Sequence, residues 1–570
     1  MRRNARSRFM SNAFKIIRQS PVVRQLGRAR SGGISPCKER ILPVMPYAFR
    51  LLFALFLLNS ALTFQNRWPT IGVRWALEGS LDLTVLLLAL AALIAWRGAP
   101  GRFLRWVVLG VYALLVMGRY VDVTAPALMG RSVQFYWDSQ HLPNVLAMFT
   151  ARLSSAQLLL GGLALLALVV AVLAALRWAL NTVLSALTRP VERRVVSALA
   201  VVLLSVYTAG RLSPRLSTEH SFALPVSAML VEQARLTLAA TVFRNHDRLD
   251  AAPLLPVSDL GRLQRGDLFV IFFESYGALT FDDPRFAGPL AGDFAALERE
   301  LAAAGWGIAS ARVESSTFGG GSWLAHSSLL SGLRIADQGD YQHLLTTDRP
   351  TLARRFASAG YRTVAIMPGL KFPWPEGRFY GFTEIYQPDR LAYHGPAYGW
   401  WVIPDQYSLY RIHRNEVDVA GRAPLFIFFP TINSHIPFAP LPPYQPDWRN
   451  FDVDPDSATI VAADAPLNGP ELAAAYVRSI RYNLAVLSGY LRQYAPPNAL
   501  FLVLGDHQPP AVVGGQNLPW QVPAHLFSRD PTLLARFTAA GFQPGIRPGP
   551  VALGGIERLG PLLLETLDTR

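Results

Sequence analysis

Long apolar runs dominate the first 210 residues of the chain. They lie at Leu51–Phe64 with an apolar flank from Ile41, and at Leu81–Trp96, Phe103–Gly118, Leu153–Leu176 and Val195–Gly210. A helix crosses a bilayer with about 20 apolar residues, and arginine side chains at its ends can extend to the interface. The pattern therefore predicts a five-span membrane domain over residues 41–210, in which Leu153–Leu176 is the clearest span because it contains no charged residue.

A different pattern follows residue 210. Residues 211–265 are mixed and are predicted to be a juxtamembrane linker that contains an amphipathic helix over Val226–Val242. From residue 266 to 570, short apolar runs typical of buried strands alternate with helical patterns. The predicted strands are Leu268–Phe273, Gly307–Val313, Arg362–Met367, Leu425–Phe429 and Ala499–Leu504, and the predicted helices are Phe294–Ala304, Trp323–Gly332 and Pro470–Tyr494. Such alternation predicts an α/β domain with a mainly parallel sheet covered by helices.

The charge of the chain is distributed unevenly between these two parts. The formal net charge is +15, but residues 1–210 hold 24 of the 54 Lys and Arg residues and 6 of the 39 Asp and Glu residues. The net charge is thus +18 for the apolar part and −3 for residues 211–570. This distribution is typical of a membrane anchor that carries a near-neutral domain, and it excludes a basic nucleic-acid-binding domain as the main interpretation.

The positions of the arginines also predict the orientation of the anchor. Residues 1–40 form a basic leader, and further arginines follow the second and fourth predicted spans. Loops that are rich in Lys and Arg remain in the cytoplasm, so the N-terminus is predicted to be cytoplasmic. Five spans then place residues 211–570 outside. The stretch of about 50 residues before the start of the first run is too long for the charged region of a cleaved signal peptide.

Polar residues with metal-ligand chemistry follow three of the predicted strands. Glu274 follows Leu268–Phe273, His435 lies shortly after Leu425–Phe429, and Asp506 and His507 follow Ala499–Leu504. Ligands of parallel sheets collect at the carboxyl ends of strands, so we expect these side chains to meet. Carboxylates with imidazole suit one divalent ion, Mn²⁺ or Zn²⁺, with Mg²⁺ also compatible. The single cysteine, Cys37, lies in the leader and excludes both a thiolate metal site and an intrachain disulfide.

A candidate nucleophile lies in the serine- and glycine-rich segment 315–322. Three glycines precede Ser322, and the apolar spacing after Trp323 predicts a helix. Ser322 is therefore predicted to be the N-cap, where the helix dipole and free N–H groups favour an anion. The alternatives are that Ser322 only caps the helix, and that Thr317 is the nucleophile.

Four motifs together resemble a known family. They are E-S-Y-G at Glu274–Gly277, the Gly-Ser pair that opens a helix at Ser322, S-H-x-P-F at Ser434–Phe438, and G-D-H at Gly505–His507. The chain resembles the membrane sulfatase-like transferases of the alkaline phosphatase superfamily, which include lipoteichoic acid synthases, phosphoglycerol transferases and phosphoethanolamine transferases. The resemblance covers the anchor and about residues 266–530. It therefore implies an alkaline phosphatase/sulfatase-like fold.

The resemblance also implies roles for individual residues. Glu274, Ser322, Asp506 and His507 would hold the metal, with Ser322 also the nucleophile, and His435 would hold the substrate phosphate. Trp374 and Arg378, within FPWPEGRFYGF, would contact the substrate. Two features depart from the family: Ser replaces its usual Thr nucleophile, and no cysteine lies outside the leader. Neither Cys37 nor Ser322 lies in the C/S-x-P-x-R motif of true sulfatases.

The implied activity is transfer of a phospholipid head group, phosphoglycerol or phosphoethanolamine, to a glycan or lipid acceptor of the cell envelope through a phospho-serine intermediate. The implied location is the bacterial inner membrane, with a periplasmic or extracellular catalytic domain. Two alternatives remain open on the sequence. The domain could be a phosphodiesterase or phosphatase with water as acceptor, or a catalytically inert lipid-binding sensor that retains the fold.

Overall fold

The computed structural model describes residues 47–150, 153–213, 218–242, 246–371, 374–398, 401–452, 460–461 and 469–570. The predicted basic leader over residues 1–40 and the apolar flank of the first predicted span, residues 41–46, lie outside the described residues.

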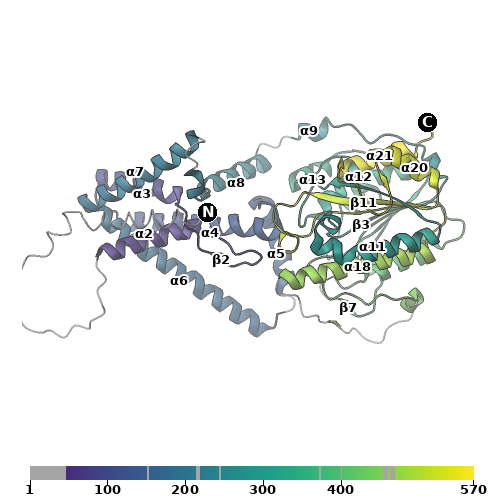
Figure 1. Cartoon of the computed structure of the whole chain (residues 1–570), viewed down its shortest axis with the longest axis horizontal. Helices are drawn as coiled ribbons and strands as arrows, with labels where there is room; N and C mark the ends of the chain where they lie inside the picture. Colours follow the sequence, from purple (N-terminus) through teal and green to yellow (C-terminus); the bar gives the residue numbers. More distant parts are fainter. Residues whose placement is uncertain are drawn as a thin grey trace, which may run out of the picture. The chain divides into compact units, whose positions relative to one another are not determined.

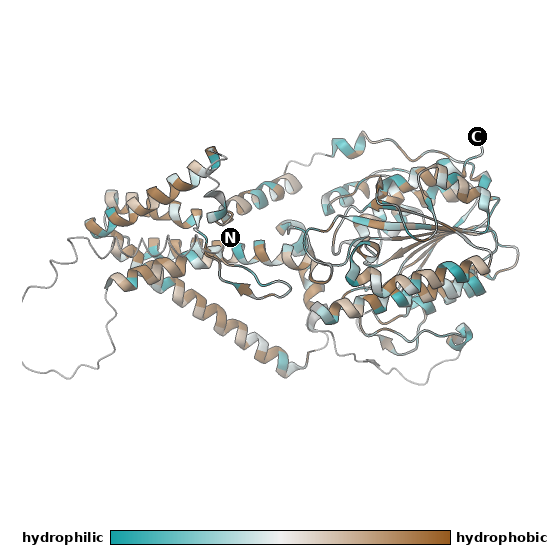
Figure 2. Cartoon of the chain, viewed as in Figure 1, coloured by the Kyte–Doolittle hydropathy of each residue, from teal (hydrophilic) through white to brown (hydrophobic). Residues whose placement is uncertain are grey.

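Six helices form the N-terminal part of the described chain. They are α2 (Tyr47–Thr63), α3 (Leu81–Arg97), α4 (Arg102–Met129), α5 (Phe135–Thr150), α6 (Ser155–Leu187) and α7 (Pro190–Leu212). Among the described residues, α4, α6 and α7 are long and apolar enough to cross a membrane, and α2 is a shorter apolar helix. Figure 2 shows the apolar character of these helices as brown ribbon. The apolar N-terminal helices are thus confirmed, whereas the number of five spans stays a prediction.

Two of these helices are longer than the apolar runs that predicted them. Helix α6 continues to Leu187 rather than ending at Leu176, and α4 continues to Met129 rather than Gly118. In the extension of α6, Leu180, Val183 and Leu184 are buried against the other N-terminal helices. The extension is therefore amphipathic, and a search for continuously apolar sequence ends too early.

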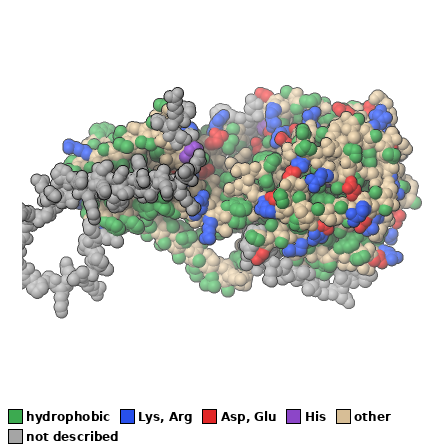
Figure 3. All heavy atoms as spheres, in the orientation of Figure 1, with side chains coloured by type: hydrophobic (Ala, Val, Ile, Leu, Met, Phe, Trp, Pro, Cys, Tyr) green, Lys and Arg blue, Asp and Glu red, His purple; other side chains and the backbone are tan. Residues whose placement is uncertain are grey.

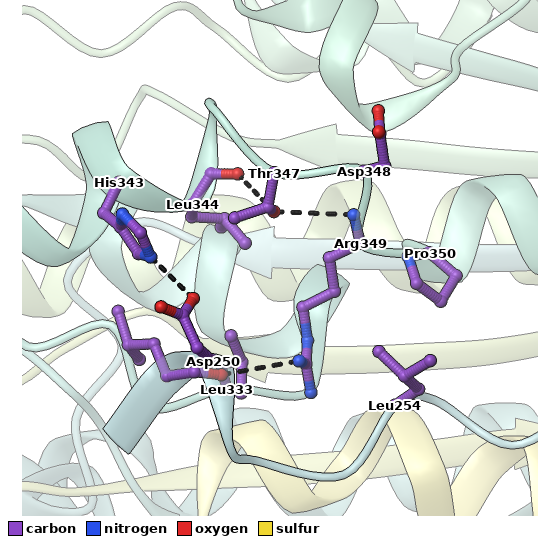
Figure 4. Close-up of a pocket in the computed structure, with 10 residues that line it drawn as sticks. Asp250, Leu254, Leu333, His343, Leu344, Thr347, Asp348, Arg349 and Pro350 are labelled. Carbon is purple, nitrogen blue, oxygen red and sulfur yellow. Dashed lines mark hydrogen bonds and ion pairs between the residues drawn. The ribbon is translucent and has the colours of Figure 1, made fainter. Parts of the chain in front are cut away.

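The linker forms the predicted helix and then contacts the C-terminal domain. Helix α8 spans Val226–Thr241, and α9 (Asp247–Asp250) follows it. The guanidinium of Arg349 donates hydrogen bonds to the carbonyl oxygens of Leu249, Ala252 and Pro253, and His343 Nε2 lies 2.7 Å from Asp250 Oδ1. Figure 4 shows these side chains around a cavity of about 230 Å³. These contacts fix the linker on the domain, and none of the sequence-predicted site residues lines this cavity.

A nine-stranded sheet organises the C-terminal part. Its strands are β3 (Leu268–Phe273), β4 (Gly307–Glu314), β5 (Arg362–Ile366), β6 (Glu384–Tyr386), β8 (Leu425–Pro430), β10 (Leu500–Gly505), β11 (Gln521–Ser528), β12 (Gln543–Pro544) and β13 (Ala552–Gly555). The order is β12-β4-β11-β10-β3-β8-β5-β6, and β13 pairs with β4. The run from β10 to β6 is parallel, whereas β11 is antiparallel to both of its neighbours. The predicted mainly parallel sheet is confirmed.

Helices cover both faces of this sheet (Figure 1). Helices α11 (Pro284–Ala303) and α18 (Gly469–Gln493) pack on the face that receives Phe269, Ile271 and Phe273. Helices α12 (Ser322–Ser331), α14 (Leu352–Ser358), α20 (Pro531–Ala539) and α21 (Leu559–Leu567) pack on the opposite face. Since both faces are buried, β3 has no polar alternation, which explains why the strand appears in the sequence as a continuous apolar run.

One long strand of the sheet was not predicted. The sequence of β11, QVPAHLFS, contains Pro523 and the buried His525. His525 is accommodated because its ring nitrogens lie 3.0 Å from the Tyr276 hydroxyl and 2.7 Å from the Ser310 hydroxyl. Partners distant in the sequence thus stabilise a strand that lacks a strong local pattern.

A buried ion pair connects the starts of the central strands. Asp267, which precedes β3, accepts hydrogen bonds from both terminal nitrogens of Arg422 at 2.8 and 2.5 Å and from the Leu425 N–H at 2.8 Å. Asp267 is 2% exposed. The carboxylate therefore joins β3 to β8 at the edge of the sheet opposite to the strand ends that carry Glu274 and Asp506.

We predict that Asp267→Ala lowers the free energy of unfolding of the C-terminal domain by about 2–3 kcal/mol, because the substitution leaves a guanidinium and a buried N–H unpaired. Denaturant titration of the detergent-solubilised protein followed by tryptophan fluorescence measures this change. Asp293→Ala is the control, because Asp293 pairs with Arg481 at the surface and its loss is expected to cost under about 1 kcal/mol. Equal effects of the two substitutions would contradict the importance of the buried pair.

Candidate metal centre

Three potential metal ligands meet at the carboxyl ends of the two central strands. Glu274 follows β3, and Asp506 and His507 follow β10, which is parallel to β3 with Gly505 opposite Phe273. The ligand atoms of the three side chains lie within 4.8 Å of one another. Glu274 is 8% exposed, and Asp506 and His507 are each 1% exposed. The sheet register thus brings together three of the four residues that the sequence predicted to meet, and among the described contacts none joins the fourth, His435, to them.

Ser275 holds the two carboxylates in place. Its N–H donates to Asp506 Oδ1 at 2.8 Å, and its hydroxyl donates to Glu274 Oε1 at 2.8 Å. Ser275 has a φ of 58°, in the left-handed region, and the Tyr476 hydroxyl donates to its carbonyl oxygen. Residues other than glycine adopt this conformation when surrounding contacts compensate for it, which is a pattern typical of functional sites.

Ser322 completes the cluster. Its Oγ lies 3.1 Å from Glu274 Oε2 and 3.2 Å from His507 Nε2. Ser322 is the first residue of α12, and the N-cap is Gly321, so the prediction that Ser322 is the N-cap is wrong. The hydroxyl points at the cluster instead of capping the helix. Glycines at positions 319–321 have φ values of 66°, 144° and 77°, which other residues rarely adopt, and this turn delivers Ser322 to the cluster.

Thr317, the alternative nucleophile, has a different environment. Its hydroxyl donates a hydrogen bond of 2.5 Å to the carbonyl oxygen of Gly320, and Thr317 is 3% exposed. Among the described contacts, none joins this hydroxyl to Glu274, Asp506 or His507. The hydroxyl of Thr317 thus stabilises the glycine turn, and Ser322 offers the hydroxyl that contacts the cluster.

The hydrogen bonds of His507 prepare it to bind a cation. Its Nδ1 lies 2.8 Å from the carbonyl oxygen of Gln508. A carbonyl oxygen can only accept, so Nδ1 carries the proton and, in the neutral ring, Nε2 keeps a free electron pair. That nitrogen is the one nearest Ser322 Oγ, and it also lies 3.6 Å from Glu274 Oε1. A ring oriented through its other nitrogen is typical of histidine ligands.

The residues present fit a divalent cation. Asp506 Oδ2 is buried and has no hydrogen-bond partner among the described residues. Burial, followed by the charge of Glu274, raises the pKa of Asp506 to about 6. Two buried carboxylates at this separation repel each other, and a cation between them removes the repulsion. Two carboxylates, one imidazole and a half-buried hydroxyl form a donor set suited to Zn²⁺ or Mn²⁺.

His435 lies on the loop after β8, and Asp405 positions this loop. Asp405 Oδ1 and Oδ2 accept the N–H groups of Ile432 and Asn433 at 2.9 and 2.8 Å. Burial raises the pKa of Asp405 to about 7, and the charge of Glu274 adds to the shift. The His435 ring packs edge-on against Trp401 at 4.6 Å, and burial lowers the pKa of His435 to about 4. His435 is therefore a neutral imidazole on an ordered loop.

Trp374 and Arg378 are not joined to the cluster by any described contact. Trp374 stacks on Tyr380 with ring centroids 5.7 Å apart and packs against the hydrophobic core, whereas Arg378 is exposed. Their predicted contact with substrate stays a prediction. His326, which follows Ser322 on α12, has its ring against Phe272 and Phe428, and burial lowers its pKa to about 4. This environment is that of a core histidine.

Sequence reasoning did not identify the residues that support the site. Besides Ser275 and Asp405, Ser434 donates to the Glu274 carbonyl oxygen at 2.6 Å, and Asn483 on α18 donates to Ser434 Oγ. Ser275 and Ser434 lie inside motifs already singled out, so their proximity to Glu274 and His435 was an available signal. Asp405 and Asn483 lie in segments without a motif, and only the fold brings them to the site.

Comparison with known proteins agrees with this geometry. Residues 315–527 match the sulfatase family model. The match includes Ser322, His435, Asp506 and His507, and it confirms the resemblance to sulfatase-like proteins. No curated protein sequence matches the chain.

Several solved structures show a likeness to the fold. A protein of the alkaline phosphatase superfamily from Vibrio parahaemolyticus has 20% identity and a TM-score of 0.31, over 47% of this chain and 60% of that protein. The lipoteichoic acid synthase LtaP from Listeria monocytogenes has 13% identity and a TM-score of 0.35, over 55% and 76%. The periplasmic domain of the phosphoethanolamine transferase EptC from Campylobacter jejuni has 12% identity and a TM-score of 0.34, over 54% and 94%. The chain thus spans less than two thirds of the Vibrio protein, and likenesses at this level carry nothing about activity.

We predict that the protein purified without chelator holds about one divalent ion per chain and that Asp506→Asn reduces this content at least tenfold, because loss of a ligand weakens metal sites by factors of about ten to a hundred or more. Elemental analysis by mass spectrometry measures the ion. Glu300→Gln, which removes a carboxylate that contacts Ser488 at the surface, is the control and is expected to leave the content unchanged. Equal metal content in the protein and in Asp506→Asn would contradict the assignment.

Proposed function

We propose that the protein transfers a phospholipid head group, phosphoglycerol or phosphoethanolamine, to a glycan or lipid acceptor of the cell envelope. The observation that carries the proposal is the position of the Ser322 hydroxyl, within 3.2 Å of both Glu274 and His507 at the start of a helix. A hydroxyl held between a carboxylate and an imidazole, beside the proposed cation position, is the arrangement of a nucleophile rather than of a helix cap.

The reaction proceeds in two displacements at phosphorus. In the first, Ser322 Oγ forms a bond to the phosphorus of the donor lipid, and the bond from phosphorus to the diacylglycerol oxygen breaks. The hydroxyl proton of Ser322 ends on the released diacylglycerol. In the second, the acceptor hydroxyl forms the new bond to phosphorus, the bond to Ser322 Oγ breaks, and Ser322 regains a proton. The head group is thereby transferred without net hydrolysis.

Groups of the chain itself support each displacement. Glu274 Oε2 accepts the hydrogen bond of the Ser322 hydroxyl and orients it. The first N–H groups of α12 and the positive end of its dipole favour the phosphate oxygens. Glu274, Ser322, Asp506 and His507 would hold the divalent ion, Mn²⁺ or Zn²⁺. When bound, such an ion polarises phosphoryl oxygens and favours the ionised form of a hydroxyl beside it.

Contacts between the serine loop and the N-terminal helices support a lipid donor. A Cβ placed on Gly319 would lie 2.1 Å from the carbonyl oxygen of Met129, the last residue of α4, and one placed on Gly130 would lie 2.1 Å from the Phe318 ring. The Trp323 ring lies 5.0 Å from that of His141 on α5. The loop that carries the nucleophile thus packs against the end of an apolar helix, close to where lipid head groups would lie.

Water as acceptor is the second candidate reaction, because the nucleophile and the metal ligands would be the same. The inert lipid-binding alternative is disfavoured by the unpartnered Asp506 oxygen and by the strained Ser275, since both belong to a centre whose four predicted ligands meet. Covalent labelling separates an enzyme from a binding protein, and the fate of the adduct separates transfer from hydrolysis.

We predict that incubation with the donor lipid leaves a head-group phosphate on Ser322. The full-length protein is incubated separately with phosphatidylglycerol and phosphatidylethanolamine, and intact mass spectrometry measures the added mass, which identifies the donor. Peptide mapping then locates the adduct. Ser322→Ala is expected to abolish it, since the other hydroxyl that contacts the cluster, that of Ser275, is buried and donates its proton to Glu274 Oε1.

Thr317→Ala is the matched variant for this experiment. It removes a hydroxyl from the same loop and is expected to retain an adduct on Ser322, though more slowly because the glycine turn loses a hydrogen bond. An adduct on Thr317, or an unchanged adduct in Ser322→Ala, would refute the assignment of the nucleophile. The rate at which the adduct is lost is then compared with and without a glycan or lipid acceptor. Equal rates would favour a hydrolase, because water would then be the acceptor.

The proposed location is the bacterial inner membrane, with the N-terminus in the cytoplasm and the catalytic domain in the periplasm or outside. The net charge of +18 in residues 1–210 supports this orientation. Figure 3 shows acidic and basic side chains interspersed over the visible face of the C-terminal part, as expected for a near-neutral domain. This distribution supports a phospholipid donor and an uncharged or lipid acceptor rather than nucleic acid.

We predict opposite accessibility for two cysteines introduced into a Cys37→Ser background. Ala420→Cys, on the C-terminal domain, is expected to react with a membrane-impermeant maleimide in intact cells, whereas Thr188→Cys, between α6 and α7, is expected to react only after permeabilisation. Both positions are exposed, so folding does not hide them. Labelling of Thr188→Cys in intact cells together with protection of Ala420→Cys would reverse the orientation.

A further inference from the structure

A groove lies between helices α4 and α6, away from the candidate metal centre. It has a volume of about 460 Å³, within the range of roughly 300–1,000 Å³ that is usual for small-molecule sites. Its lining is formed by Trp106, Leu109, Val170, Leu173, Ala174, Arg177, Trp178 and Asn181. Every one of these residues belongs to α4 or α6, two helices that are long and apolar enough to cross a membrane.

The groove has an apolar end and a polar end. Val170 and Leu173 line one end. Arg177 and Asn181 line the other end, at least one helical turn further along α6. Val170 and Asn181 are separated by about 16 Å along the helix axis at 1.5 Å per residue. Trp106 and Trp178 lie beside the polar end, and tryptophan is enriched where a membrane meets water. The groove thus has apolar and polar ends in the same order as the acyl chains and head group of a phospholipid.

The cationic groups at the polar end lack anionic partners. The Arg177 guanidinium lies 4.7 Å above the Trp106 ring, and Arg105 donates to Asn181 Oδ1 at 3.1 Å and to the Pro100 carbonyl oxygen at 3.2 Å. These acceptors are neutral. Among the described ion pairs, no carboxylate lies within 4.0 Å of Arg105 or Arg177, so two positive charges remain uncompensated beside the groove.

We propose that this groove binds one anionic glycerophospholipid from the leaflet at the arginine-rich end of the helices. The phosphate lies between Arg177 and Asn181 within reach of Arg105, and one acyl chain lies along Leu109, Val170 and Leu173. Arginine forms paired hydrogen bonds with phosphate, and basic pockets between membrane helices are suited to anionic head groups. The site is separate from the proposed catalytic centre, and the proposal does not rest on the transfer reaction.

The test uses the full-length protein in detergent and a photoreactive phosphatidylglycerol whose reactive group is on the acyl chain. Cross-linking followed by peptide mapping is expected to label α4 or α6 residues of the groove. Phosphatidylcholine with the same reactive chain is expected to label them about tenfold less at equal concentration, since its trimethylammonium group offsets the phosphate charge and is repelled by Arg105 and Arg177. Labelling of the catalytic domain is scored separately.

Three variants distinguish lipid binding in the groove from general electrostatic attraction of anionic lipid to the protein surface. Arg177→Ala is expected to bring phosphatidylglycerol labelling to within about twofold of phosphatidylcholine labelling, through loss of the phosphate contact. Ala174→Phe, which fills the groove without changing charge, is expected to abolish labelling by both lipids. Arg97→Ala removes a charge that stacks on Trp96 outside the groove, and it is expected to have no effect.

Equal labelling by the two lipids in the parent protein would overturn the proposal, as would labelling that survives Ala174→Phe. A loss in Arg97→Ala equal to that in Arg177→Ala would show general electrostatic attraction instead of a site. Size-exclusion elution of each variant checks its folding, and retained metal content checks the catalytic domain. Failure of the Ser322 adduct experiment would leave these outcomes unaffected.

Discussion

The repulsion between two buried carboxylates, Glu274 and Asp506, is the constraint on which the rest of the site depends. Their oxygens lie within 4.8 Å of one another in a region with almost no solvent exposure. Each is held by a group that the fold provides, the N–H and the hydroxyl of Ser275. The parallel register of β3 and β10 determines that they must be neighbours. Buried contacts that hold two carboxylates close together fit a site that is organised around a cation.

Under the proposed function, this constraint also accounts for phosphate binding without a basic surface. The C-terminal part carries a net charge of −3, and its helical covering leaves the strand ends as the place where substrate can approach. Attraction for phosphate must therefore be local, from the cation position and from the first turn of α12. The positive charge of the chain lies elsewhere, among the apolar N-terminal helices, where it supports the proposed orientation and where Arg177 lines the polar end of a groove, with Arg105 beside it.

The sequence predicted those parts of the fold that depend on local pattern. Strands β3, β8 and β10 are buried on both faces and appear as apolar runs, and the residues after them were identified because strand ends are chemically distinctive. Strand β11 was missed because Pro523 and His525 interrupt its pattern and its partners lie far away in the sequence. The C-terminal ends of α4 and α6 were missed because only one face of each helix stays apolar beyond the end of the continuous apolar run.

Within the site, residues whose role is chemical were more predictable than residues whose role is positional. Glu274, Asp506 and His507 have side chains that suggest ligands wherever they lie. Asp405 acts by accepting the N–H groups of a distant loop, which has no signature in a single sequence, and the left-handed φ of Ser275 has none either. Ser322 was predicted to be the helix N-cap, whereas Gly321 is the N-cap and the serine hydroxyl faces the cluster.

The separation of the ligands along the chain has a consequence for which ion the protein acquires. Ser275 and Asp506, whose contact aligns the two carboxylates, are 231 positions apart. The site therefore cannot form within a short stretch of chain and is complete only when β10 pairs with β3. Affinities of such donor sets follow the Irving–Williams order, so an exposed nascent site would bind the most competitive ion present. With the domain outside the cytoplasm, as proposed, the ion would come from that compartment, and the place of folding would determine which ion is bound.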